Sequence, residues 1–168
     1  MPLSDATRAK LRRVSTATLA TALFKRGFRQ QMIQGALPIH APGAESMVGE
    51  AFTVRYIPAR EDLNTLDVFR DPGHKQRVAI EECPPGSVLV FDSRKDARAA
   101  SAGGILVARL MKRGVAGVVT DGGFRDSPDI AGYDMPAYHV RPSAPTNLTL
   151  HEAIEINGPI GCGGSPAP

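Results

Sequence analysis

The segment from residue 87 to residue 126 constrains the fold more than any other part of the sequence. Compact apolar runs at 87–92 and 115–120 flank a long amphipathic stretch at 96–113. This order predicts strand, helix and strand, and therefore a βαβ unit with two parallel strands. In such units ligands bind beyond the carboxyl ends of the strands, where this chain has Asp92 and Asp121. The predicted inner stripe of the helix consists of Ile105, Leu106, Ala108, Leu110 and Met111.

Elements on either side of this unit are predicted from caps and breakers. Ser4 and Ser15 or Thr16 are typical N-caps of two short helices, which form an N-terminal helical segment at about 4–28. We further expect a strand at 47–57, a helix at 74–83 and a strand at 136–140. The stretch 158–168 is rich in glycine and proline and is expected to form little regular structure. At 168 residues, the chain is predicted to form a single domain.

Composition excludes several classes of protein. Aromatic residues make up 5% with no Trp, and the net charge of +3 is scattered, so we expect no nucleic-acid partner. No apolar run approaches the ~20 residues that span a bilayer, and no signal peptide opens the chain, which favours a cytoplasmic protein without membrane contact. Two distant cysteines favour neither zinc nor a disulfide. The sequon at Asn147 has no meaning without secretion.

The loop after the strand at 115–120 concentrates groups that can do chemistry. It carries Asp121, Arg125, Asp126 and Asp129, with two glycines that allow a tight turn. Carboxylates are ligands suited to Mg²⁺ or Mn²⁺, and an adjacent arginine can hold a substrate carboxylate through a bidentate fork. These groups together suit a small 2-keto acid. The alternative from the residues alone is an ordinary Asp-Gly turn with a surface ion pair.

A second candidate lies at Gly103-Gly104-Ile105-Leu106, where an alanine-rich segment meets the predicted helical stripe. If a helix begins near Gly104, its first N–H groups form an anion site. If the helix instead runs through this point, the two glycines allow another segment to pack closely against it. The residues leave both interpretations open.

The spacing between these two segments is similar to a family signature. Twenty residues separate Gly104 from Arg125, and Arg125-Asp126 is followed by two residues and then Asp129. This resembles the Gly-X20-Arg-Asp-X2-Glu/Asp signature of the RraA-like family, which includes metal-dependent 4-hydroxy-4-methyl-2-oxoglutarate aldolases and the protein regulator of ribonuclease E activity. Further matches are the segments 48–54, 85–90, 113–119 and 159–164.

The resemblance implies a fold and a set of residue roles. The fold is α/β, in the layered β/β/α arrangement of the swivelling phosphohistidine domains, assembled as a homotrimer or a homohexamer of two trimers with the active site at a subunit cleft. By position, Asp126 is the implied ligand of Mg²⁺ or Mn²⁺, and Arg125 the ligand of the substrate carboxylate. The segment from Gly103 through Gly104 and Ile105 to Leu106 is the implied substrate-binding backbone. Asp121 and Asp129 are candidates for orienting metal-bound water.

The implied function is a metal-dependent carbon–carbon lyase for a small 2-keto acid. It would be a 4-hydroxy-4-methyl-2-oxoglutarate aldolase or an oxaloacetate decarboxylase, acting through a metal-stabilised pyruvate enolate. Two alternatives stay open: a dehydratase of 2-keto-3-deoxy sugar acids with the same site, and a non-catalytic regulator that binds a ribonuclease.

Three features depart from the family pattern. Ile105 stands where the family often has Glu, and no lysine follows Lys112, although the aldolases use a downstream lysine near the catalytic water. The chain also ends at Pro168 without the closing segment of the family. We therefore expect a C-terminus that is truncated or divergent.

Overall fold

A six-stranded sheet forms the centre of the structure, a computed structural model that describes residues 3–39 and 46–167. The four inner strands are parallel, and the two edge strands are antiparallel to their neighbours. A smaller parallel sheet contains β4 (Ala100–Ala102), β6 (Gly123–Phe124) and β8 (Arg141–Pro142). In spatial order the large sheet consists of β1 (Leu37–Pro38), β7 (Ala137–His139), β5 (Gly117–Thr120), β3 (Val88–Asp92), β2 (Ala51–Pro58) and β9 (His151–Ile156).

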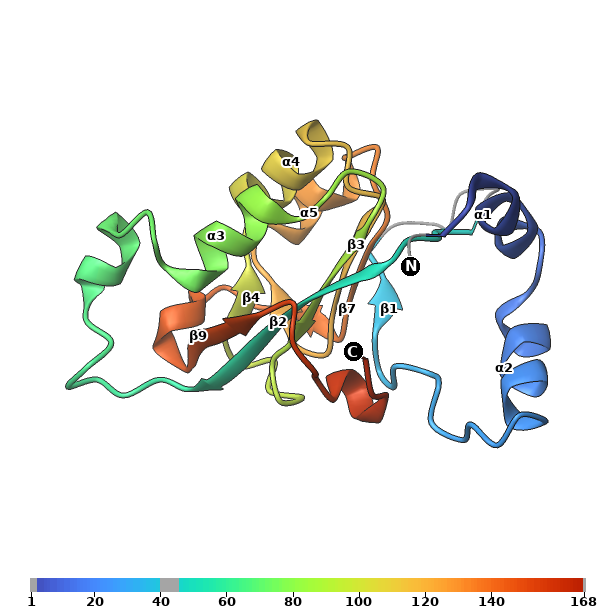
Figure 1. Ribbon diagram of the computed structural model, residues 1–168. Coiled ribbons are helices and arrows are strands. Elements are labelled where there is room, and N and C mark those ends of the chain that lie inside the picture. Colours follow the sequence, from blue (N-terminus) through green and yellow to red (C-terminus); the bar gives the residue numbers. More distant parts are fainter. Residues whose placement is uncertain (1–2, 40–45, 168) are drawn as a thin grey trace.

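Three helices lie together on one side of the large sheet: α3 (Lys75–Glu82), α4 (Gly104–Lys112) and α5 (Ser127–Ala131) (Figure 1). Alternate side chains of β3 enter two separate apolar clusters, as the period of a strand requires. Leu89 and Phe91 join the larger cluster, which also contains residues of the helices. Val88 and Val90 join a smaller one with Ile160 and Cys162. The predicted layered α/β fold is confirmed.

The predicted βαβ unit is present, but its helix is shorter than expected. β3 and β5 pair in parallel, with Val88 opposite Gly117. The predicted helix at 96–113 is wrong in its first half, where β4 runs in extended conformation and pairs with β6. Small buried residues at 99–102 fit a narrow space between sheets, so tertiary pairing overrides the helix propensity of alanine. Of the predicted inner stripe, Leu110 is buried and Leu106 and Met111 pack against the core, whereas Ile105 is 86% exposed. Val107, which the prediction left out, is buried.

The C-terminal stretch is more ordered than its composition indicated. Ile160 pairs with Ala167 in an antiparallel bridge, and a short 3-10 helix, η3 (Cys162–Gly164), lies between them. Two further 3-10 helices are η1 (Leu66–Arg70) and η2 (Asn147–Thr149). The strand expected at 47–57 begins only at Ala51.

The two N-terminal helices confirm the caps read from the sequence. Ser4 caps α1 (Asp5–Arg12), and Ser15 caps α2 (Thr16–Phe24). α1 is attached to the body through Arg8, whose guanidinium donates to the carbonyls of Val48 and Gly86 and pairs with Glu50 at 2.8 Å. α2 has no buried residue and stands away from the sheets (Figure 1).

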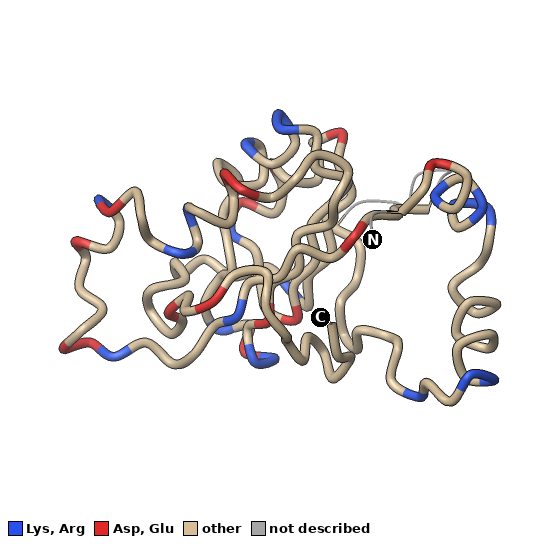
Figure 2. The backbone as a smooth tube through the Cα atoms, viewed as in Figure 1, with Lys and Arg blue, Asp and Glu red and all other residues tan. Residues whose placement is uncertain are grey.

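Charged residues of both signs are interspersed along the described part of the chain (Figure 2). Within that part, no helix has the length and apolar character that crossing a bilayer requires.

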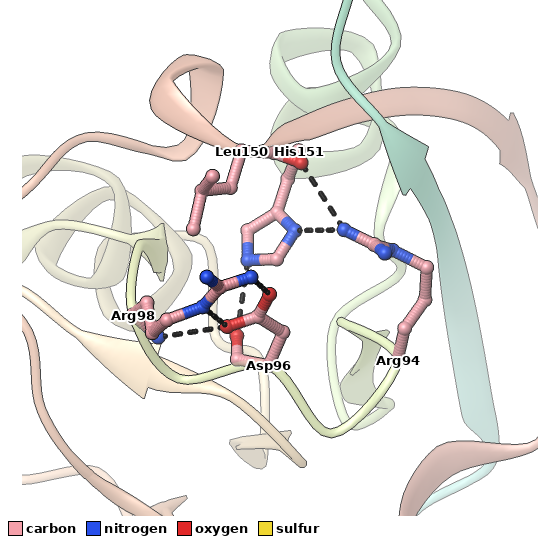
Figure 3. Close-up of polar contacts among 5 residues, drawn as sticks. All are labelled: Arg94, Asp96, Arg98, Leu150 and His151. Carbon is pink, nitrogen blue, oxygen red and sulfur yellow. Dashed lines mark hydrogen bonds and ion pairs between the residues drawn. The ribbon is translucent and has the colours of Figure 1, made fainter.

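The connection from β3 to β4 is held by a buried histidine (Figure 3). His151 Nε2 donates to the carbonyl of Asp96 at 3.1 Å, and Nδ1 accepts from the guanidinium of Arg94 at 3.0 Å. The same guanidinium donates to the carbonyl of Leu150, while Arg98 pairs with the Asp96 carboxylate at 2.7 Å. Because this connection leads directly into β4, His151 contributes to the position of the segment that follows β4.

Candidate functional site

A cleft of about 310 Å³ opens where the two parallel strands β4 and β6 end. β4 leads through Gly103 into α4, and β6 leads through Arg125 and Asp126 into α5. The general rule that ligands bind beyond the carboxyl ends of parallel strands therefore applies here to the smaller sheet. From the sequence, the ligand site was expected beyond the carboxyl ends of β3 and β5 instead. The lining consists of Phe69, Gln76, Arg77, Ala102, Gly103, Ile105, Leu106, Arg125, Asp126, Thr146 and Asn147.

Asp126 is fixed at the cleft by the start of α4. Its Oδ2 accepts the backbone N–H of Gly104 at 2.9 Å, which satisfies one of the N–H groups that a helix leaves unpaired at its first turn. The residue has left-handed backbone angles, φ 55° and ψ 35°, and begins α5 as its N-cap. Such angles are uncommon outside glycine and tolerated best by Asp and Asn. They turn the carboxylate back toward α4, where it remains exposed.

The two glycines at the start of α4 suit this close approach. A Cβ on Gly103 would lie 3.1 Å from Asp126 Oδ2, and a Cβ on Gly104 would lie 3.2 Å from Asp126 Cβ and 3.3 Å from the hydroxyl of Tyr133. Of the two interpretations left open by the sequence, a helix that begins near Gly104 is confirmed, and a helix that runs through this point is wrong, although the close packing that it expected is present.

Arg125 lies beside Asp126 with its side chain exposed at the cleft. Its backbone N–H donates to the carbonyl of Ala102 at 3.0 Å, which continues the pairing of β4 with β6. Within the described part of the chain, its guanidinium has no hydrogen-bond or ion-pair partner. The fork is therefore available to a carboxylate that enters the cleft.

The structure does not bring the other two predicted acids into this lining. Asp121 is 1% exposed, and its carboxylate accepts the backbone N–H groups of Ser93, Lys95 and Gly163 at 2.7, 3.1 and 2.9 Å. Burial raises its pKa above the ordinary value, although the three N–H donors oppose this shift. Asp129 is exposed in the first turn of α5. Both acids thus lie outside the described lining of the cleft.

A family model described as RraA-like, Aldolase/RraA, matches residues 16–166. The chain belongs to the RraA-like family. A curated relative from Halalkalibacterium halodurans, provisionally named 4-hydroxy-4-methyl-2-oxoglutarate aldolase, is 33% identical over 92 residues. The match covers 52% of this chain and 41% of that relative's length.

Solved structures of RraA-like proteins have the same fold. RraAS2 of Streptomyces coelicolor, described as an unusual member of the RNase ES inhibitor RraA family, matches with a TM-score of 0.86 at 24% identity, over 99% of this chain and 78% of that one. The RNA-processing inhibitor RraA from Thermus thermophilis matches with a TM-score of 0.64 at 19% identity, over 92% and 83% of the two chains. At these identities the similarity establishes the fold alone.

Several lining residues of this RraA-like cleft were missed by sequence reasoning. Gln76 and Arg77 come from α3, Phe69 from η1, and Thr146 and Asn147 from the start of η2. None belongs to the signature, and each comes from an element distant in sequence from residues 103–126. Only Asn147 carried a signal, the glycosylation sequon, and that signal pointed elsewhere. With 4% of its surface exposed, Asn147 is too buried to serve as a glycosylation acceptor.

Proposed function

We propose that this RraA-like protein is a divalent-metal-dependent lyase that cleaves a carbon–carbon bond in a small 2-keto acid. The observation that carries the proposal is the pair Arg125 and Asp126, placed together at the start of α4 with glycines that suit this placement. Substrates of the 4-hydroxy-4-methyl-2-oxoglutarate or oxaloacetate type present a carboxylate next to a keto group. The guanidinium and the carboxylate, set side by side, suit these two neighbouring groups.

The donor set fits Mg²⁺ or Mn²⁺ with several water ligands better than a metal ion whose ligands all come from the protein. Among the described residues no group of three or more His, Cys, Asp or Glu side chains converges to hold an ion. Mg²⁺ commonly takes one or two protein carboxylates and keeps several waters, so Asp126 alone suffices as protein ligand. Only Oδ2 of Asp126 accepts from the backbone of Gly104. When bound, the ion would supply Lewis-acid stabilisation of the negative charge that develops on the keto oxygen.

The side chains of this chain have separate roles in the proposal. Arg125 holds the substrate carboxylate in a bidentate fork and so orients the bond to be broken. The N–H of Gly104 holds Asp126 in place before the substrate arrives, so that no reorganisation is needed during the reaction. Arg77 adds a second positive charge to the lining, and Asp126 is its one acid among the described residues, which favours anionic substrates.

Pyruvate release tests the proposal. It should be measured from 4-hydroxy-4-methyl-2-oxoglutarate and from oxaloacetate with Mg²⁺, after EDTA treatment, and after Mg²⁺ is restored. Asp126→Ala should lower kcat/KM by roughly 100-fold or more, a loss typical of removing one key electrostatic group. Asp134→Asn is the matched control, because Asp134 is an exposed acid that follows α5 and lies outside the lining. Turnover that survives both EDTA and Asp126→Ala would disprove metal dependence.

The alternatives have distinct outcomes in the same experiment. Water loss from a 2-keto-3-deoxy sugar acid, without pyruvate release from either substrate, would identify a dehydratase that uses the same cleft. Absence of turnover with all three substrates, together with tight binding to a ribonuclease, would favour a regulator. The similar structures carry names of ribonuclease and RNA-processing inhibitors, so this second outcome is worth measuring.

A further inference from the structure

Asn147 lines the cleft and carries a buried hydrogen-bond donor that the protein does not use. The residue is 4% exposed and is the first residue of η2. Its Oδ1 accepts from the hydroxyl of Thr146 at 3.1 Å, whereas Nδ2 is covered and has no acceptor among the described residues. Buried polar groups without a partner are few in folded proteins, and each is costly. The unused N–H groups of Asn147 therefore require an explanation.

A second carboxamide in the same lining shows the ordinary arrangement. Gln76 is 5% exposed, and its Nε2 donates to the hydroxyl of Tyr56 at 2.9 Å and to the carbonyl of Ser101 at 2.6 Å. Its donors are thus used inside the protein, where they join α3 to β2 and β4. Asn147 makes no corresponding contact through Nδ2. Two buried amides in one cleft therefore differ, one satisfied internally and one not.

Asn147 also lies close to the start of α4. η2 packs against β4, and the N–H of Ala100 in β4 donates to the carbonyl of Pro145 at 2.9 Å. β4 then leads directly into Gly103, which lines the cleft together with Asn147. The carboxamide, the first turn of a nine-residue helix and the guanidinium of Arg125 thus border one space. All three are donors, which suits a ligand rich in acceptor oxygens.

We propose that Asn147 is a substrate-binding residue whose Nδ2 donates a hydrogen bond to a carboxylate or keto oxygen of a 2-keto acid in the cleft. This inference rests on the proposed function for the class of ligand. The Cβ–Cγ torsion of asparagine is broad, so the carboxamide can turn toward an entering oxygen without a change in the backbone. Nδ2 has no internal partner to give up, so its hydrogen bond is made only in the complex. Its gain in affinity is offset in part where the turn breaks the hydrogen bond that Oδ1 accepts from Thr146.

Oxalate and pyruvate binding in the presence of Mg²⁺, measured by titration calorimetry, tests the assignment apart from turnover. Asn147→Leu keeps a side chain of similar size without the donor, and Asn147→Asp replaces the donor by a negative charge at nearly constant shape. Both should raise the Kd for oxalate by about 10- to 100-fold, the range expected for a lost hydrogen bond to a charged group. Asn147→Asp should have the larger effect, because it also repels the anion.

Thermal unfolding of the ligand-free variants separates a binding role from a structural one. Asn147→Leu should unfold close to the midpoint of the wild type, since it loses only the part-buried hydrogen bond that Oδ1 accepts from Thr146 and removes an unpaired Nδ2. Gln76→Leu, the matched comparison, should unfold at a lower midpoint because it removes two buried hydrogen bonds. If Asn147→Leu does not fold, the Kd of Asn147→Asp decides the outcome.

The possible failures are distinguishable. A wild type that turns over keto acids, with variants at Asn147 that bind oxalate as tightly as it does, would overturn the role of Asn147 and leave the proposed function standing. A wild type that neither binds oxalate or pyruvate nor releases pyruvate would overturn both.

Discussion

The backbone of Gly104 lies so close to Asp126 that an added Cβ requires a shift of a few tenths of an ångström in the site. We expect Gly104→Ala to lower kcat/KM by about 10- to 100-fold, as misplacement of a catalytic group does. The added Cβ would meet Asp126 Cβ at 3.2 Å and displace the carboxylate. Pyruvate release and the unfolding midpoint should be measured together. Gly161→Ala is the matched control, because a Cβ there meets no atom within 4 Å. Equal activities of the two variants would contradict the requirement for glycine.

We expect His151 to make the stability of the protein sensitive to acid. Burial, and next the charge of Arg94, lower its pKa below the ordinary value of 6.5. Between the lowered folded pKa and 6.5 the unfolded chain binds more protons than the folded one, so stability is lost as the pH falls through this window. One histidine accounts for at most about 1.4 kcal/mol per pH unit.

Urea unfolding between about pH 5 and pH 7 measures this effect. We expect His151→Gln to lose less stability on acidification than the wild type does. His139, whose pKa is also lowered by burial, is the matched comparison, and His139→Gln should reduce the dependence in the same direction. A His151→Gln variant with the full acid sensitivity of the wild type would refute the assignment.

Asp121 joins the C-terminal turn to the large sheet. Its carboxylate bridges the N–H groups of Ser93 and Lys95, which follow β3, and that of Gly163 in η3. We expect Asp121→Ala to lower the free energy of unfolding by about 3 kcal/mol or more, because three N–H groups lose their acceptor. The loss should be smaller for Asp92→Ala, since Asp92 is half-buried and accepts from two N–H groups, those of Arg94 and Gly161.

Denaturant unfolding and pyruvate release distinguish this structural role from the catalytic one expected from the sequence. A structural Asp121 lowers stability and leaves the turnover of the folded fraction near that of the wild type. Full stability with lost turnover would instead place Asp121 among the groups that orient metal-bound water.

The local parts of the fold were predictable, whereas the contacts that build the cleft were not. Ser4 and Ser15 act as caps as predicted, and the apolar runs at β3 and β5 form the expected parallel pair. The small residues at 96–103 suit both a helix and a buried strand, so composition alone did not exclude the predicted helix. Only the pairing of β4 with β6 decides between them.

The site was predictable only along the signature. Arg125 and Asp126 follow from their spacing to Gly104, and the structure places all three at one cleft. Asn147 did not follow, because its burial and its unpaired Nδ2 arise from packing between η2 and β4. Such a contact between segments distant in sequence leaves no periodic or motif signal.

At the scale of the whole molecule, the chain exposes more surface than a compact monomer of its size. Its accessible surface is 9640 Å², whereas a monomer of 17.8 kDa is expected to expose roughly 8,000 Å². The excess of about 1,600 Å² exceeds the ~800 Å² that each partner contributes to a standard interface. The exposed large apolar side chains include Phe24 in α2 at 65% and Leu66 in η1 at 77%. We therefore expect contacts between copies that cover both.

α2 and η1 lie at opposite ends of the molecule (Figure 1). When two different surfaces at opposite ends contact each other, the assembly is head-to-tail and closes into a ring where the rotation allows it, which suits the trimer expected from the sequence. Phe24→Glu and Leu66→Glu should each reduce the mass measured by light scattering toward that of a monomer. Mixing the two variants should restore a dimer, because each retains the surface that the other has lost. A face-to-face contact between identical surfaces would give no such rescue, so a mixture that stays monomeric would exclude the head-to-tail arrangement.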